Sequence, residues 1–382
     1  MDMDIQTRLV HAGEEDKVEN AVVTPIFQSA TFVAEEGGGY DDIRYMRLSN
    51  TPNHNALHAK LASIAGGEAA LVTGSGMAAI STALLALLKS GDHLLIQDCL
   101  YGGTHSLVSH ELPELGIGHD FIAGNAADTW AARLKPQTKA IYVETMTNPL
   151  LEVADLEAVV AFASEHGLVS LIDNTFASPC NFRPLELGFD IELHSATKYL
   201  NGHSDIVAGV AIGSQEHIGA MTHKLNHYGG SLDAHACFLL HRGLKTLSLR
   251  MRQHDENGLR LAQFLREQPQ VGQGSYPGLD NHPQYERAQR LFIGAGGVLN
   301  FELRGGITAA RRLVDAVRLA ASAPSLGGVE TLITRPATTS HSSLSPAQRA
   351  AIGVGDDLVR VACGIEAPED LCADFAQALA QV

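Results

Sequence analysis

The sequence predicts an α/β protein with a mostly parallel, helix-covered sheet and a smaller C-terminal α+β domain. Between residues 56 and 244, short apolar segments typical of buried strands alternate with helical patterns, as in a βαβ series. After residue 245 the pattern changes to longer amphipathic helices and a few strands. A chain of 382 residues also exceeds the usual size of one compact core. We therefore expect an N-terminal arm (residues 1–55), a larger domain (56–244) and a C-terminal domain (245–382).

The arm shows little periodicity, and regular elements follow it. In chain order, the larger domain is expected to contain a helix near residues 56–65, a strand over 69–73, a helix ending at 89, strands over 93–97 and 139–144, a helix over 153–166 and a strand over 169–173. The C-terminal part is expected to follow a linker helix that carries residues 241–251, and to contain strands over 297–303 and 358–362.

Composition and charge exclude several classes of protein. The net charge is −16 with no basic cluster, which argues against nucleic acid and against anionic membrane surfaces as partners. The N-terminus lacks the basic start and apolar core of a secretory signal. The most apolar long run, residues 78–88, is shorter than the ~20 residues that span a bilayer. Five cysteines without a C-x-x-C pair indicate reduced thiols and a cytoplasmic protein.

The most informative residues are Lys198 and Asp173. Lys198 lies in the run S195-A-T-K-Y-L-N-G-H203, just after an apolar segment, and Asp173 closes an earlier apolar run. Pyridoxal phosphate (PLP) needs a lysine amine for a Schiff base and a carboxylate that keeps its pyridine nitrogen protonated. Ser195 and Thr197 flank the lysine and offer hydroxyls for the cofactor phosphate. Taken alone, however, a lysine is usually a surface charge, and Asp173 could equally be a helix N-cap.

Two weaker features agree with the same cofactor. The run T73-G-S-G-M77 joins a predicted strand to a predicted helix, so its backbone N–H groups could approach a phosphate. An ordinary glycine turn is the alternative. Tyr101 follows another strand and could stack on the pyridine ring, with core packing as the alternative.

Together these motifs resemble one family, the Cys/Met metabolism enzymes, a cystathionine-metabolising branch of the fold-type-I PLP enzymes. The resemblance covers nearly the whole chain, and the run around Lys198 is its most specific part. The other motifs that carry it are T73-G-S-G-M-A-A79, Y101-G-G-T104, E144-T-M-T-N-P149, D173-N-T-F-A-S178, R242-G-L-K-T-L247, Y276-P-G-L279, S325-L-G-G-V-E330 and L358-V-R-V-A-C-G-I-E366.

The resemblance implies roles around the cofactor. Lys198 would bind PLP covalently and later carry protons, and Asp173 would pair with the pyridine nitrogen. Tyr101 would stack on the ring and act in proton transfer. The remaining cofactor contacts that it implies are the backbone of Gly76 and Met77, the hydroxyls of Ser195 and Thr197, and the side chain of Asn148.

The resemblance also implies a substrate site and an assembly. Arg360 would clamp the α-carboxylate of an amino-acid substrate, in a pocket lined by Asn148, Ser325 and Thr339. Tyr45 and Arg47 would reach across to the phosphate site of a neighbouring subunit. The active unit would then be at least a dimer, and the family is usually tetrameric.

Three positions depart from the family pattern. The arm reads N50-T-P52 where Asn-Pro-Thr is common, so the cross-subunit loop can differ in shape. Pro324 stands where cystathionine γ-lyases and γ-synthases often carry a glutamate for the distal amino group of the substrate. Family members often have a serine where Ala362 or Cys363 stands.

Metal chemistry has little support. His54 and His58 are spaced i, i+4 on a predicted helix, but no third ligand accompanies them. We therefore predict no metal site.

The expected activity is that of a PLP-dependent carbon–sulfur lyase of sulfur amino-acid metabolism, acting on cystathionine or a related substrate by γ-elimination. A γ-synthase acting on an O-acylhomoserine, a cystathionine β-lyase and a methionine γ-lyase use the same residues and remain open. Two other classes also remain. An aminotransferase would share Lys198 and Asp173 but not the run around the lysine, and a catalytically silent relative would not bind the cofactor.

Overall fold

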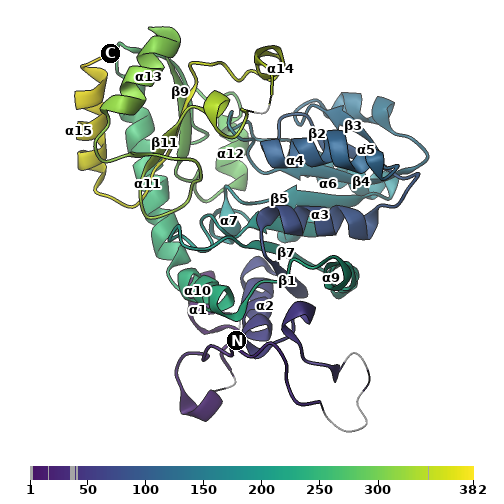
Figure 1. The fold of residues 1–382 in the computed structure, drawn as a ribbon. Helices are drawn as coiled ribbons and strands as arrows, with labels where there is room; N and C mark the ends of the chain where they lie inside the picture. The colour runs from purple at the N-terminus through teal and green to yellow at the C-terminus, as the bar shows by residue number, and fades with distance from the viewer. Residues whose placement is uncertain (1–2, 16, 35–38, 40–41, 343) are drawn as a thin grey trace.

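The structure is a computed structural model, and it describes residues 3–15, 17–34, 39, 42–342 and 344–382 (Figure 1). Two sheets with their helices make up most of the molecule, and the N-terminal segment extends from the larger one (Figure 1). The domain boundaries predicted after residues 55 and 244 stay a prediction. Across the described residues, we find no helix that is both long and apolar enough to cross a membrane.

The larger sheet has seven strands in the described part of the chain, in the order β1-β7-β6-β5-β4-β2-β3. Neighbours from β6 to β3 pair in parallel, and β7 is antiparallel to both β6 and β1. The mostly parallel α/β sheet is therefore confirmed. Its strands are β1 (Ala69–Thr73), β2 (His93–Gln97), β3 (Gly118–Ile122), β4 (Thr138–Glu144), β5 (Val169–Asp173), β6 (Ile191–Ser195) and β7 (Gly209–Gly213).

Helices cover both faces of this sheet, which suits its nearly continuous apolar strands. The helices of the N-terminal segment and of the larger domain are α1 (Ile5–His11), η1 (Val18–Asn20), η3 (Met46–Leu48), α2 (Pro52–Ala65), α3 (Gly76–Leu87), α4 (Gly102–Ser106), η4 (Leu107–Glu111), α5 (Leu112–Glu114), η5 (Ala127–Arg133), α6 (Leu156–His166), α7 (Ser178–Asn181), α8 (Pro184–Leu187), α9 (Gln215–Tyr228) and α10 (Ala234–Leu244). On one face α3, η4 and α9 bury apolar side chains such as Leu84 and Met221 against the sheet. On the other face α2, α6 and α10 do so.

The second sheet has the order β10-β11-β12-β9-β8 among the described residues and is mostly antiparallel. Helices α11, α13 and α15 pack on one face around Phe301 and Phe375. This confirms the smaller second sheet domain. The elements are α11 (Leu247–Arg266), β8 (Val271–Ser275), α12 (Tyr285–Leu291), β9 (Val298–Leu303), α13 (Gly306–Ala316), β10 (Ala321–Ser322), β11 (Leu332–Thr334), η6 (Pro336–Thr338), α14 (Pro346–Ala351), β12 (Val359–Ala362) and α15 (Pro368–Leu379).

The predicted linker helix over residues 241–251 is wrong in one respect. The chain forms two helices there, α10 and α11, separated by Lys245 and Thr246. The break is compatible with the apolar pattern because both helices bury leucines in the same core, including Leu244 and Leu247.

A buried arginine ties α11 to the loop that follows β6. Arg250 is 4% exposed, and its guanidinium donates hydrogen bonds to Tyr199 O at 2.7 Å and to Gly243 O at 2.8 Å. A Cβ atom at Gly202 would lie 2.0 Å from Arg250 Nη1, so only glycine leaves room for the guanidinium. Arg250 therefore fixes the backbone directly after Lys198.

We expect Arg250→Met to lower the free energy of unfolding by about 3 kcal/mol, because it leaves buried carbonyl oxygens without donors. Denaturant unfolding of the purified protein measures the loss. The matched control is Arg260→Met on the same helix, whose exposed pair with Glu369 should contribute less than about 1 kcal/mol. Equal losses in the two variants would contradict the assigned role of Arg250.

Candidate active site

A cavity of about 540 Å³ lies where the carboxyl ends of β4, β5 and β6 meet the N-terminus of α3 and the second sheet. Ligands of open α/β sheets bind at this edge. The lining residues are Ser75, Gly76, Met77, Ile80, Tyr101, Glu144, Met146, Asn148, Asp173, Thr175, Phe176, Ser195, Thr197, Lys198, Val207, Pro324, Ser325, Leu326, Thr339, Ser340 and Arg360.

The cavity brings together most of the residues that the sequence singled out. From the cofactor set, Gly76, Met77, Tyr101, Asn148, Asp173, Ser195, Thr197 and Lys198 line it, and from the substrate set Ser325, Thr339 and Arg360 do. Tyr45 and Arg47 do not. Arg47 lies in η3 and donates to Asn226 O at 2.6 Å, outside this cavity. Their contribution to a neighbouring subunit stays a prediction.

The Lys198 side chain is half-buried, and its amine has a neutral partner. Its Nζ donates to the Ser325 hydroxyl at 2.7 Å. Burial, reinforced by the nearby Arg360 guanidinium, lowers the pKa of Lys198 to about 8. A larger share of this amine is therefore neutral near pH 7 than in an exposed lysine, and the neutral form is the nucleophile.

Two carboxyl groups end neighbouring strands at the inner side of the cavity. Asp173 and Glu144 are directly opposite in the β4–β5 register. Burial raises the pKa of both, and their proximity raises the pKa of Glu144 further. Thr175 donates to Asp173 through its backbone N at 3.0 Å and also through its hydroxyl. A bound cation would relieve this unfavourable burial of negative charge, and the protonated pyridine ring of PLP is such a cation.

The opposite end of the cavity suits a phosphate. Ser75 caps α3 by accepting from Ala78 N at 3.0 Å, which leaves the N–H groups of Gly76 and Met77 in the first helical turn. A Cβ at Gly76 would lie 2.8 Å from Ser195 Cβ, so glycine lets the helix approach β6. The Thr197 hydroxyl is already bonded to the backbone of Ala208. The donors of α3 and Ser195 thus fit a PLP phosphate better than Thr197 does.

Tyr101 stands at the mouth of the cavity with its side chain 42% exposed. Its backbone N donates to Glu144 Oε1 at 2.7 Å. A Cβ at Gly103 would lie 2.6 Å from the Tyr101 ring and 3.0 Å from Met77 Sδ, so Gly103 leaves room for the ring. The position fits stacking on a planar cofactor.

Arg360 forms the wall on the side of the second sheet. The guanidinium is 4% exposed, and it donates to Asn148 Oδ1 at 3.0 Å and to Ser325 O at 2.9 Å. Its Nε has no hydrogen-bond partner among the described residues. Ser325 adopts a φ of +98°, a strained conformation for a residue other than glycine. An arginine with unused N–H groups is suited to a carboxylate.

Sequence reasoning missed two residues of this site as individuals. Glu144 appeared only within a family motif, although it ends an apolar strand just as Asp173 does, and that signal could have found it. Thr175 also appeared only within a family motif, and no local pattern pointed to it, because its contacts to Asp173 and to Ser195 N depend on the turn after β5.

The positions that depart from the family pattern have local explanations. Asn50 accepts from Tyr45 N at 2.9 Å and donates to Ile43 O at 2.7 Å, so it organises the arm segment. Pro52 is the first residue of α2, a position that proline favours. Pro324 lines the cavity. Cys363 and Ala362 are buried in the second sheet region and do not line it.

His54 and His58 have structural partners. His54 bonds to Thr51 Oγ1 at 2.7 Å and to Leu232 O at 2.8 Å, and His58 Nε2 accepts from Val72 N at 3.0 Å. Within the described ranges, no group of three or more His, Cys, Asp or Glu side chains is placed to hold a metal ion.

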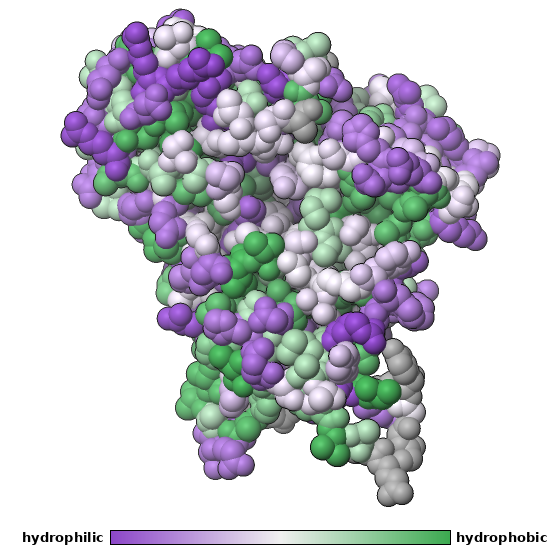
Figure 2. Space-filling view, viewed as in Figure 1, coloured by the Kyte–Doolittle hydropathy of each residue, from purple (hydrophilic) through white to green (hydrophobic). Residues whose placement is uncertain are grey.

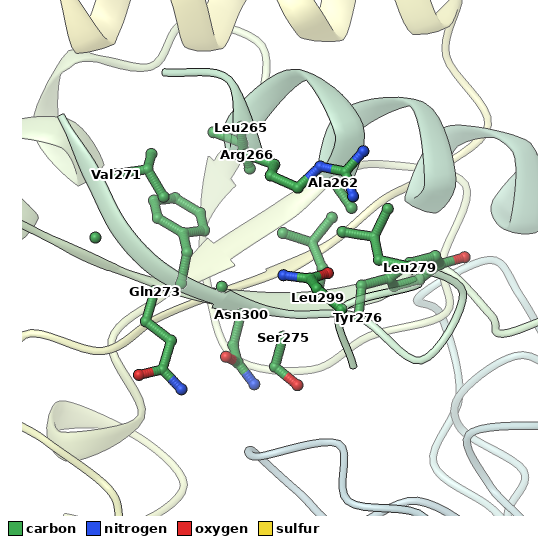
Figure 3. Close-up of a pocket in the computed structure, with 14 residues that line it drawn as sticks. Ala262, Leu265, Arg266, Val271, Gln273, Ser275, Tyr276, Leu279, Leu299 and Asn300 are labelled. Atoms are coloured by element: carbon green, nitrogen blue, oxygen red, sulfur yellow. The ribbon is translucent and has the colours of Figure 1, made fainter. Parts of the chain in front are cut away.

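A second cavity, of about 340 Å³, lies between α11 and the strands β8 and β9 (Figure 3). Its charged side chain is Arg266, which pairs with Asp280 at 2.7 Å. It offers no acid–base pair and no lysine, so the first cavity is the candidate active site.

Comparison with known proteins supports the same assignment. The family model for "Cys/Met metabolism PLP-dependent enzyme" matches residues 6–380. The chain is 43% identical to the cystathionine beta-lyase MetC of Bacillus subtilis (strain 168), over 99% of this chain and 97% of that protein. It is 41% identical to the L-methionine gamma-lyase of Pseudomonas putida, over 98% and 96%. The solved structure of cystathionine gamma-lyase from Lactobacillus plantarum complexed with L-serine superposes with a TM-score of 0.94 at 35% identity, over 100% and 99%.

We expect the cofactor-free protein to capture PLP on Lys198 faster as the pH rises through about 8, because the neutral amine is the nucleophile. Borohydride trapping followed by peptide mass spectrometry measures the adduct. Arg360→Leu should move the midpoint to higher pH, since it removes a cation that disfavours protonation of Lys198. A midpoint at the ordinary lysine pKa, about 10.4, would contradict the effect of burial.

Proposed function

We propose that this chain cleaves cystathionine by γ-elimination. The chain belongs to the Cys/Met metabolism PLP-dependent enzyme family, and it is a PLP-dependent carbon–sulfur lyase of sulfur amino-acid metabolism. The observation that carries the proposal is the meeting of Lys198, Asp173 and Arg360 in one cavity. The reaction consumes one water molecule, and the proposed products are cysteine, 2-oxobutyrate and ammonia. Cleavage at the β-carbon, giving homocysteine, pyruvate and ammonia, is the second candidate, favoured by the 43% identity to a cystathionine beta-lyase.

The proposed role of each residue in the site follows from its charge. When bound, PLP supplies an electron sink for the negative charge that develops at the substrate α-carbon. Asp173 balances the positive pyridine nitrogen, and the first turn of α3 holds the phosphate. Arg360 and Asn148 orient the α-carboxylate. The Lys198 amine would be the base that removes the α-proton, and its lowered pKa suits that task.

The arm supports an assembly with sites shared between subunits. Val22 and Val33 are 79% and 98% exposed, and apolar side chains gather at the lower part of the molecule, where the arm lies (Figure 2). Apolar surface of this kind marks protein interfaces. Together with Tyr45 and Arg47, which stand outside their own cavity, it supports a homo-oligomer in which the arm completes the neighbour's phosphate site. The tetrameric state and the cytoplasmic location remain predictions.

We expect the PLP-loaded protein to release 2-oxobutyrate from L-cystathionine, identified by chromatography of the keto acid. Lys198→Ala should reduce turnover by at least about 1,000-fold, since it removes both the nucleophile and the base. The matched control is Lys89→Ala, an exposed lysine that does not line the cavity. Pyruvate in place of 2-oxobutyrate would select the β-lyase, and no keto acid would refute both candidates.

We expect co-expressed Lys198→Ala and Arg47→Ala chains to regain activity that each lacks alone. In a mixed oligomer, one site would combine an intact Lys198 with an intact Arg47 from the neighbour. Activity of purified mixed oligomers tests this, and Arg44→Ala, in the same segment, serves as the control for unspecific damage to the arm. If mixed oligomers form but stay inactive, Arg47 does not act across subunits.

A further inference from the structure

Four polar residues lie in register across the second sheet. Ser275 in β8 is opposite Asn300 in β9, Asn300 is opposite Arg360 in β12, and Arg360 is opposite Thr334 in β11. Directly opposite residues of antiparallel strands point to the same face. Figure 3 shows Ser275 and Asn300 doing so, on the side away from α11. We refer to these four residues as the polar row.

Three members of the polar row contact three consecutive residues of one loop. Arg360 Nη1 donates to Asn148 Oδ1 at 3.0 Å, and Asn300 Nδ2 donates to Pro149 O at 2.7 Å. Ser275 Oγ donates to Leu150 O at 3.1 Å. Successive strands of the sheet therefore hold successive residues of the loop that follows β4.

The fourth residue of the polar row, Thr334, contacts the other wall of the candidate active site. The Thr334 hydroxyl is 3.0 Å from the hydroxyl of Thr339, which lines the cavity. The polar row thus contacts residues on both sides of Arg360.

Among the contacts of the polar row, the one between Asn300 and Pro149 lies directly next to Asn148 in the chain. Neither Asn300 nor Pro149 lines the candidate active site. Asn300 is 5% exposed and Asn148 is also 5% exposed, so water cannot easily replace the lost donor for the Pro149 carbonyl. At its base the loop is closed by Thr147 N donating to Glu152 O at 3.0 Å. Without Asn300, the segment that carries Asn148 would lose its nearest anchor on the second sheet apart from Arg360 itself.

These contacts connect Asn300, the loop after β4 and Arg360 to one another. Asn300 holds Pro149, the residue after Asn148. Asn148 accepts a hydrogen bond from Arg360, and Arg360 pairs with Asn300 on the neighbouring strand. The arrangement fixes the guanidinium relative to the loop, and small displacements of groups that orient a substrate have large effects on binding.

We propose that Asn300 is a positioning residue for the substrate α-carboxylate, acting through Pro149 and Asn148 on Arg360. The inference rests on the proposed function, in which Arg360 binds that carboxylate. Asn300 lines two other cavities but not the candidate active site. It therefore affects the substrate without touching it.

The test compares two ligands on the PLP-loaded protein. L-Alanine carries the α-carboxylate and lacks a thiol leaving group, whereas L-alaninamide has a neutral amide in its place. Binding of each is followed by the change in cofactor absorbance. In Asn300→Leu, which keeps the side-chain size but cannot donate, we expect L-alanine to bind about tenfold more weakly. L-Alaninamide should change less than about twofold, because the clamp gains little from a neutral group.

The controls separate positioning from general loosening. Gln273→Leu, an exposed position on β8, should leave the ratio of the two affinities unchanged. If Asn300→Leu does not fold, Asn300→Ser, whose side chain is too short for the same contact, should weaken L-alanine selectively in the same direction. Equal weakening of both ligands, or no change in either, would overturn the proposal. Failure of the proposed function would appear separately, as wild-type protein that releases no keto acid from L-cystathionine.

Discussion

The separation of charge across one cavity is the constraint on which the site depends. Two acids, Asp173 and Glu144, end strands of the larger sheet, whereas the cation Arg360 lies on the second sheet and the cation Lys198 contacts Ser325. Each group is buried at a cost that its protein neighbours only partly offset. A ligand with a cationic ring and anionic ends would pair with both the two acids and the two cations. The two sheets must therefore be held at a fixed distance, and Arg250 and the polar row are contacts that hold loops of the site in place.

Much of this site could be predicted from the sequence because parallel strands place their carboxyl ends at one edge. The apolar runs before Asp173 and Lys198 put both residues there without any knowledge of the second sheet. Strand β3 escaped prediction because G-H-D-F-I is half polar at the edge of the sheet. Strand β7, with glycine at both ends, lacks the length and flanking signals that separate a strand from a loop.

The contacts made by the second sheet could not be predicted in the same way. Ser275, Asn300 and Arg360 come from segments far apart in the chain, and their alignment depends on the register of three strands. A bulge between Val271 and Gly274 shifts β8 before it reaches Ser275. No local pattern encodes such an alignment, because each residue by itself resembles an ordinary polar position in a half-buried strand. The family resemblance identified Arg360 for this reason, while Asn300 carried no signal.

The row across the second sheet has a consequence for how such a protein can diverge. A single insertion in β8, β9 or β12 would turn the side chains of that strand to the opposite face and would disconnect the loop residue that the strand holds. The α-carboxylate recognition that we propose for Arg360 would thus depend on the register of the whole second sheet. Pro324, by contrast, lines the cavity from an irregular segment and can be exchanged without altering any strand pairing. Substitutions in this irregular wall can therefore change which substrates fit more easily than substitutions in the sheet can. The range of leaving groups can change in this way while the shared chemistry stays constant.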